Sequence, residues 1–276
     1  MKPQKTVVTD FKERGKTMEQ VVVVIPNYKA ELNAYDRLSV SRTCEVLKDY
    51  PIVMIHPEGL DLSAIRRDFP QLRYRSFNPE YFSGIMGYNR LMLSTSFYEA
   101  FSGYEYMLIC QTDAYVFRDE LREWCMKGYD YVGAPWLKKR LYDFPVMRLC
   151  MRLSLWWKHC RGKRSKQELY GKVGNGGLSL RKVASHIETL RQKSETVERY
   201  LDRKKKYHLF NEDVFWALEP DDFRYPTAEE ALLFAFDKYP QLSFSITGGR
   251  LPMGCHAWYK RKMKAFWENR LPDIIL

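Results

Sequence analysis

The chain has 276 residues, which is enough for one large α/β domain or two small ones. Hydrophobic residues make up 45% of the chain and charged residues 29%, and this composition excludes a disordered protein. The formal net charge is +11, and no apolar run approaches the roughly 20 residues that cross a bilayer. We therefore expect a globular protein with a basic surface.

The six cysteines contain no CxxC pair, and Cys44 and Cys110 lie within apolar patterns. Such spacing indicates reduced thiols rather than a disulfide framework or a zinc site. The first residues lack the apolar core of a signal peptide. The expected location is therefore the cytoplasm.

The first half of the chain alternates strand-like and helix-like patterns after a polar N-terminal arm at residues 1–20. Strands are expected at 21–25, 52–55, 72–77 and 106–110. Helices are expected at 33–47, 62–69 and 87–101. The strand at 72–77 alternates with arginines and should lie near an edge. This order predicts a mostly parallel, doubly wound (Rossmann-like) sheet flanked by helices, in a single domain spanning 21–276.

The strand at Tyr106–Cys110 leads directly into Gln111, Thr112 and Asp113. A carboxylate at the end of a buried strand is costly unless it meets a cation or a hydrogen-bond network. Ligands of open α/β sheets gather at the carboxyl ends of the strands. Asp113 is therefore a candidate for chemistry, with the equally open alternative that it only caps a helix at 118–126.

A basic amphipathic insertion is expected at about residues 138–168, where ten Lys or Arg stand against two acidic residues. As a helix, residues 144–160 place Arg148, Arg152 and His159 on one stripe among Leu, Met, Val and Trp. This pattern suits the interface of an anionic membrane. The alternatives are a helix that covers the core or acts as a lid, and a nucleic-acid surface. The last fits poorly because basic and aromatic residues are not interleaved over a sheet.

The second half also carries helical patterns at 183–201 and from Asn211, a plausible N-cap. The sequence has no GxxxxGK loop, no GxGxxG after the first strand and no GxSxG elbow. These absences weaken the NTPase, dehydrogenase and serine hydrolase interpretations. Four polar motifs remain: Gln111–Asp113, Gly174–Gly177, Glu212–Asp213 and His256.

Each motif has both a chemical and a structural interpretation. In the chemical interpretation, Asp113 and His256 would supply two ligands of a divalent cation, and a diphosphate would supply the others. Glycines allow close approach to a sugar or phosphate, and a carboxylate at a helix start can act as a base. Alternatively, the glycines form a turn, the acids complement a helix dipole, and the histidine is structural.

Five motifs follow one another along the chain: Tyr88–Leu91, Gln111–Ala114, Val132–Trp136, Gly174–Arg181 and Asn211–Phe215. Over residues 20–260 this set resembles the DUF5672 family, a bacterial family regarded as glycosyltransferases of GT-A type. The order is also similar to that of metal-dependent galactosyltransferases with the GT-A fold. Those enzymes carry an Asp-x-Asp turn, a Gly-Gly-x-Ser segment, a Glu-Asp helix start and a late metal-binding histidine.

The resemblance implies roles for individual residues. Asp113 matches the second acid of the Asp-x-Asp motif and, with His256, would bind Mn²⁺ or Mg²⁺. Gln111 replaces the first acid; an amide can bind a ribose hydroxyl but is a poor metal ligand, so metal dependence stays open. Asp213, or Glu212, would be the base of an inverting transfer.

The resemblance also implies a donor site. The nucleotide base would lie near Pro26, Asn27 and Tyr28, and the nucleotide or its phosphates would face Asn89 and Arg90. The sugar site would be lined by Gly176, Gly177 and Ser179. The implied function is a hexosyltransferase that moves a sugar from a UDP- or GDP-linked donor to a glycan or polyprenyl-linked acceptor in surface polysaccharide synthesis. The alternatives are a nucleotidyltransferase-like enzyme and a non-catalytic basic protein that binds sugar or lipid. Residues 141–168 would contact an anionic membrane from its inner face, and no nucleic-acid partner is expected.

Overall fold

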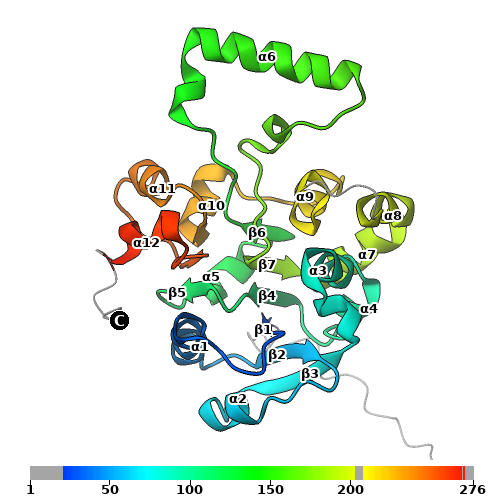
Figure 1. The fold of residues 1–276 in the computed structure, drawn as a ribbon, viewed down its shortest axis with the longest axis vertical. Coiled ribbons are helices and arrows are strands. Elements are labelled where there is room, and N and C mark those ends of the chain that lie inside the picture. The colour runs from blue at the N-terminus through cyan, green and yellow to red at the C-terminus, as the bar shows by residue number, and fades with distance from the viewer. Residues whose placement is uncertain (1–20, 203–207, 269, 271–276) are drawn as a thin grey trace, which may run out of the picture.

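The computed structural model describes residues 21–202, 208–268 and 270 (Figure 1). The expected N-terminal arm at 1–20 lies outside the described residues. A six-stranded sheet forms the centre, in the order β3-β2-β1-β4-β7-β6. Its strands are β1 (Val21–Pro26), β2 (Ile52–Pro57), β3 (Arg73–Phe77), β4 (Tyr106–Cys110), β6 (Tyr131–Gly133) and β7 (Leu178–Lys182).

The sheet is mostly parallel, as predicted, and β3 is an edge strand. Strands β1 to β4 pair in parallel, whereas β7 runs antiparallel to both β4 and β6. The apolar run of β1 is buried on both faces: Val21 and Val23 pack into one core, and Val22 and Val24 into another. Alternate side chains of a strand point to opposite faces, so a run of valines suits a sheet covered on both sides.

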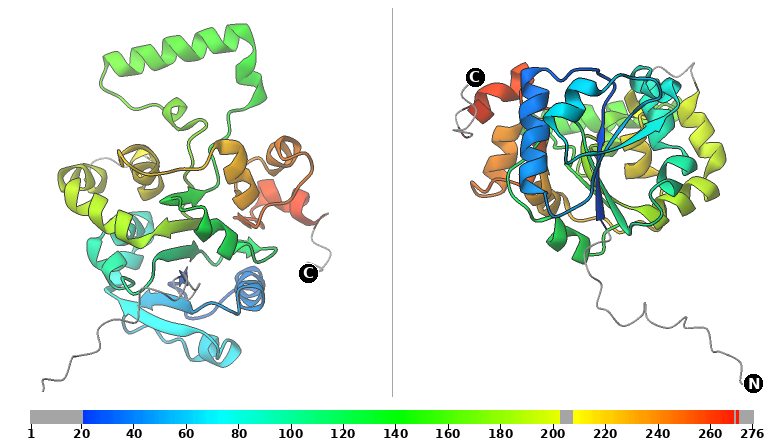
Figure 2. Two further views of the ribbon diagram at one scale, coloured as in Figure 1. Left: turned by 180° about the vertical axis from the view of Figure 1, so that it is seen from behind. Right: turned by 90° about the horizontal axis from the view of Figure 1, so that it is seen from below.

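Helices cover both faces of the sheet (Figures 1 and 2). The first face packs against α1 (Ala34–Val46), α2 (Ser63–Asp68), α5 (Leu121–Met126) and α10 (Ala228–Phe234). The second face packs against α3 (Gly84–Met92), α4 (Thr95–Glu99), α7 (Val183–Gln192), α8 (Ser194–Leu201) and α9 (Glu212–Leu218). Short 3₁₀ turns lie at η1 (Pro79–Phe82) and η4 (His208–Phe210).

Two expected long helices are each divided in the structure. The helix expected at 87–101 is α3 and α4, because Ser94 adopts extended backbone angles of φ −102° and ψ 125°. The helix expected at 183–201 is α7 and α8, which meet at Lys193, whose φ is −111° and ψ 32°. The apolar periodicity continues across both breaks, so it does not reveal them.

A second, three-stranded sheet joins the C-terminal part of the chain to the centre. Its order is β5 (Ala114–Val116), β9 (Gly254–His256) and β8 (Ala235–Phe236), and the segment ends with α11 (Pro240–Ile246) and α12 (Arg261–Glu268). The turn at Gln111–Asp113 connects β4 of the large sheet with β5 of the small one. Antiparallel pairing places Ala114 opposite His256, so the histidine lies beside the turn.

The basic insertion leaves the body of the protein and returns to it (Figure 1). It contains η2 (Arg140–Asp143), α6 (Pro145–Cys160) and η3 (Lys166–Leu169). No residue of α6 is buried, so the alternative of a helix that covers the core is wrong. Within the described ranges, no helix has the length and apolar character to cross a bilayer.

Candidate active site

Asp113 lies in the turn between β4 and β5 and faces two basic groups. Its Oδ1 lies 3.1 Å from Nε2 of His256, and its Oδ2 lies 3.0 Å from Nζ of Lys260. On the far side of the imidazole, Nδ1 lies 3.2 Å from Oδ1 of Asp237. The alternative that Asp113 only caps the helix at 118–126 is wrong, because α5 begins at Leu121 after Glu120.

The four groups form a charged network. Burial disfavours the charged form of Asp113, but His256 and Lys260 outweigh it and hold the pKa of Asp113 well below its usual value. Burial likewise disfavours the imidazolium, yet the carboxylates of Asp113 and Asp237 raise the pKa of His256 to about 9. At neutral pH, two carboxylates are therefore balanced by an imidazolium and an ammonium group.

Once the Nε2 proton of His256 is released, the same residues fit a divalent cation whose remaining ligands come from substrate. Nε2 of His256 is buried and lacks a regular hydrogen-bond partner, although it faces Asp113. Metal-binding histidines are commonly oriented by a carboxylate that accepts a hydrogen bond from the other imidazole nitrogen, and Asp237 has this place here. The described residues contain no cluster of three His, Cys, Asp or Glu with the geometry to hold a metal. A cation on Asp113 and His256 would therefore need phosphate oxygens as further ligands.

The glycine segment before β7 lets the catalytic candidates approach one another. A Cβ on Gly177 would lie 2.2 Å from Nε2 of His256, and a Cβ on Gly176 would lie 2.0 Å from Oε1 of Glu212. The N–H of Gln111 donates to the carbonyl of Gly177 at 2.9 Å. These contacts require glycine at both positions, because a side chain would displace either the histidine or the glutamate.

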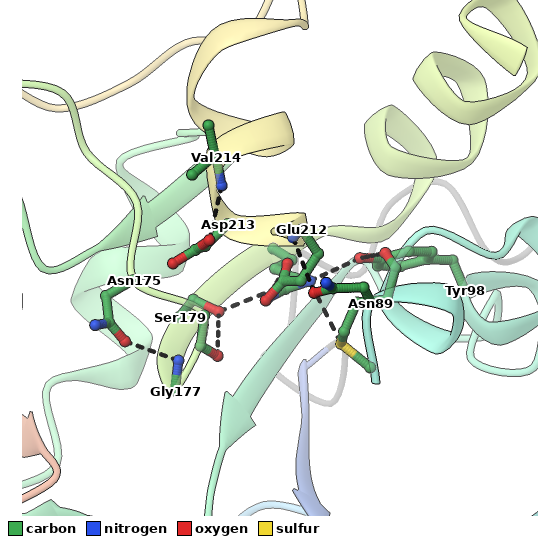
Figure 3. Close-up of polar contacts among 11 residues, drawn as sticks. Asn89, Tyr98, Asn175, Gly177, Ser179, Glu212, Asp213 and Val214 are labelled. Atoms are coloured by element: carbon green, nitrogen blue, oxygen red, sulfur yellow. Dashed lines mark hydrogen bonds and ion pairs between the residues drawn. The ribbon is translucent and has the colours of Figure 1, made fainter. Parts of the chain in front are cut away.

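Glu212 and Asp213 begin α9 but lie in different surroundings (Figure 3). Glu212 is 3% exposed and pairs at 3.2 Å with Arg181, which is fully buried. Its backbone N–H donates to Oδ1 of Asn89 at 3.1 Å. Asp213 is only half-buried, and its Oδ1 accepts a hydrogen bond from the N–H of Val214 at 2.9 Å.

Burial, together with the nearby charge of Glu212, raises the pKa of Asp213 to about 7. Burial also raises the pKa of Glu212, although the charge of Arg181 acts in the opposite direction. A carboxylate with a pKa near neutrality and access to solvent suits a general base. Glu212 is held in an internal ion pair, so Asp213 is the better placed of the two for proton transfer.

A cavity of about 550 Å³ opens beside Asp113, at the carboxyl ends of β1 and β4. Its lining combines aromatic side chains, the Gln111 turn and two lysines: Pro26, Tyr28, Lys29, Tyr81, Phe82, Gly84, Ile85, Tyr88, Gln111, Thr112, Asp113, Tyr259 and Lys260. Lys29 pairs with the buried Asp36, which also accepts a hydrogen bond from Tyr259. This size and composition are typical of a small-molecule site.

The structure gathers part of the expected donor set in this cavity, namely Pro26, Tyr28, Gln111 and Asp113. Asn27 is buried, and its side chain bonds to the backbone of Lys29. Asn89 bonds to the start of α9, and Arg90 does not line this cavity. Ser179 is buried beneath Gly176, 3.4 Å from its carbonyl.

Several residues of the site were not found from the sequence, notably Lys29, Lys260 and Asp237. Lys29 directly follows the expected Pro26–Tyr28 loop, and Lys260 lies four residues after His256. Their closeness in sequence to expected site residues could have indicated both lysines. Asp237 follows β8 and meets His256 only through the second sheet. No motif of the sequence connects those two residues.

A second cavity of about 310 Å³ lies at the base of the α6 insertion. Aromatic and basic side chains from the insertion and from the body line it, and Asp237 belongs to the lining: Pro135, Trp136, Leu137, Lys139, Tyr142, Lys166, Leu169, Tyr170, His208, Asp237, Lys238 and Tyr239. Because Asp237 also contacts His256, this cavity adjoins the charged network.

Comparison with known proteins agrees with the fold. The profile of a family described as "Protein of unknown function (DUF5672)" matches residues 71–256. Galactosyltransferase LgtC, solved with donor and acceptor sugar analogues, is 15% identical over 91% of this chain and 94% of its own, with a TM-score of 0.53. A structure of an active-site mutant of LgtC is 16% identical over 90% and 94%, with a TM-score of 0.52. No curated protein matches in sequence. These likenesses confirm the expected GT-A-like fold.

Replacing Arg181 by methionine should destabilise the fold by about 3–5 kcal/mol, because the charge of Glu212 would remain buried without a partner. Urea unfolding measures the effect. The double variant Arg181→Met/Glu212→Met should recover much of the loss. Arg191→Met, which removes an exposed pair with Glu99, should cost less than about 1 kcal/mol. Equal losses for Arg181→Met and Arg191→Met would contradict the assigned role.

Gly177→Ala should push the His256 imidazole away from Asp113, because the new Cβ would occupy its place. The pKa of His256, followed by NMR titration, should then fall from about 9 toward the ordinary value of about 6.5. Gly103→Ala is the matched control, since nothing lies within 4 Å of its Cβ position. An unchanged His256 pKa in Gly177→Ala would refute the packing argument.

Proposed function

This chain belongs to the DUF5672 family, and we propose that it transfers a glycosyl group from a nucleotide-sugar donor to an acceptor hydroxyl. The observation that carries the proposal is the charged network of Asp113, His256, Asp237 and Lys260, which opens on a cavity that Lys29 also lines. The likeness of the fold to galactosyltransferase LgtC supports it.

The donor lies in the 550 Å³ cavity in this proposal. Tyr28, Tyr81 and Phe82 supply apolar and aromatic surface for the nucleoside, and a UDP- or GDP-linked hexose is the expected donor. The diphosphate lies near Lys29 and Lys260, whose ammonium groups attract its negative charge. Gln111 contributes an amide that can bond a ribose hydroxyl.

Asp113 and His256 would hold a divalent cation, Mn²⁺ or Mg²⁺, at the diphosphate, with Asp237 orienting the imidazole. Such a cation neutralises charge that develops on a leaving diphosphate. Lys260 already pairs with the second oxygen of Asp113, so part of that charge stabilisation comes from the protein itself. Gln111, in place of the usual first acid, leaves Asp113 and His256 as the two proposed protein ligands.

The proposed reaction is a single displacement with inversion. The acceptor oxygen forms a bond to the anomeric carbon while the bond from that carbon to the diphosphate oxygen breaks. Asp213 takes the proton of the acceptor hydroxyl, for which its pKa of about 7 is suited. Arg181 and Glu212 position Asp213 by fixing the start of α9 against β7.

The acceptor enters through the 310 Å³ cavity at the base of the insertion in this proposal. Trp136, Tyr142, Tyr170 and Tyr239 offer aromatic faces on which a sugar ring can pack. A glycan or a polyprenyl-linked sugar, as used in surface polysaccharide synthesis, is the expected acceptor class. Residues 21–276 act as one catalytic domain, with 138–168 inserted in it.

The donor assignment is tested by thermal shift with UDP-, GDP- and CMP-sugars, with and without manganese. One nucleotide sugar should raise the melting temperature and be slowly hydrolysed, and manganese should enlarge the shift. Asp113→Asn should remove the manganese-dependent part, whereas Asp221→Asn, on an exposed side chain, should leave it unchanged. A shift with nucleoside triphosphates alone would indicate a nucleotidyltransferase, and no shift a non-catalytic protein.

The base assignment predicts a pH profile. A carboxylate with a pKa of about 7 is protonated below that pH, so kcat should fall as the pH is lowered through 7. Asp213→Asn should lose transfer by about 10²-fold or more while donor affinity is retained. Its residual rate should lack this pH step. Full activity in Asp213→Asn would rule out Asp213 as the base.

A further inference from the structure

Helix α6 has an inner side, which faces the returning segment, and an outer side, which carries an apolar strip. With 3.6 residues per turn, Met147, Met151 and Leu155 share one side, and all three are half-buried. The side-chain amide of Gln167, from the returning segment, donates to the carbonyl of Met151 at 3.0 Å, which fixes this side as the inner one.

The outer side of α6 is apolar and highly exposed. Leu149 and Leu153 are each 58% exposed, Trp156 is 65% exposed, and Val146 and Trp157 extend the same strip. In Figure 1 the helix lies at the end of the molecule, across its long axis, and the exposed fractions show that the described chain leaves this strip largely uncovered. Contiguous exposed apolar surface of this kind marks an interaction site.

Positive charge borders the apolar strip. Arg148, Arg152 and His159 follow one edge of the helix at intervals of four and seven residues, and α6 contains no acidic residue. Basic residues continue past its C-terminal end. Near that end, Lys158 of α6 lines a cavity together with Lys163, Arg164 and Arg199, and no acidic side chain belongs to its described lining, although Arg164 also pairs with Glu219.

We propose that α6 docks on an anionic membrane surface, with its apolar strip in the boundary between headgroups and acyl chains. The basic edge then lies against lipid phosphates, and the tryptophans lie at the level of the headgroups. A second copy of the chain is a poorer occupant, because α6 contains no acidic residue that could complement the arginines of another α6. The inference does not depend on the proposed glycosyl transfer.

Flotation of the full chain with vesicles tests the proposal. The protein should float with vesicles of equal parts phosphatidylglycerol and phosphatidylcholine, and remain below with phosphatidylcholine alone. Binding should weaken in about 1 M salt, where the Debye length is about 3 Å. Brominated lipids should quench the tryptophan fluorescence of the wild type, and the quenching should be weaker in the variant Trp156→Phe/Trp157→Phe.

Paired variants separate the two components of the surface. Arg148→Gln/Arg152→Gln should weaken partitioning about 25-fold, because each basic residue near an anionic surface contributes about fivefold. Leu149→Ser/Leu153→Ser should weaken it about a hundredfold, at about tenfold for each buried leucine. Two matched controls should bind as the wild type does. Arg66→Gln/Arg67→Gln removes two arginines from α2, at the opposite end of the molecule (Figure 1). Met126→Ser/Ile246→Ser removes two exposed apolar side chains outside α6.

Two results would overturn the proposal. The first is that, with anionic vesicles present, the unbound fraction is the same for the wild type and for Leu149→Ser/Leu153→Ser. The other is a wild-type dimer in sedimentation equilibrium that this variant converts to a monomer, which would assign the strip to a second copy. Thermal unfolding at the wild-type temperature confirms that each variant is folded, since no substituted side chain is buried.

Discussion

Arg181 and Glu212 form an ion pair in the interior, where their side chains are 0% and 4% exposed. Burying two charges costs several kcal/mol per ion unless hydrogen bonds satisfy the remaining donors and acceptors. Here the guanidinium also donates to Tyr98 and Ser179, at 2.8 and 3.0 Å. The pair joins β7 to α9, and thereby fixes where the backbone at Asp213 begins its helix.

The glycine segment transmits this constraint to the rest of the site. Gly176 gives the carboxylate of Glu212 its space, and the adjacent Gly177 gives space to the imidazole of His256. A single pair of neighbouring residues therefore lies between Glu212, which precedes the proposed base Asp213, on one side and the proposed cation ligand His256 on the other. The orientation of His256 depends on Asp237, so the small sheet supports the large one at this point.

The parts of the fold and site that follow local patterns could be predicted from the sequence. The valine run of β1, the edge position of β3 and the strand before Asp113 needed only apolar pattern and order. The break at Ser94 was missed because apolar spacing continues through it. Lys29, Lys260 and Asp237 were missed because their contacts arise from loops and from pairing between β8 and β9. The strand-end position singled out Asp113, and His256 was one of four polar motifs, but only the resemblance gave both residues a role as metal ligands.

The pairing of β5 with β9 joins residues 114 and 256, which are far apart in the chain. Closing so long a loop carries an entropic cost that is recovered only when both sheets have formed. Because synthesis runs from the N-terminus, a ribosome supplies strands β1 to β4 well before His256 and Lys260. A chain that ended before β9 would lack His256 and Lys260, which are both partners of Asp113, so the charged network can form only after synthesis has passed Lys260.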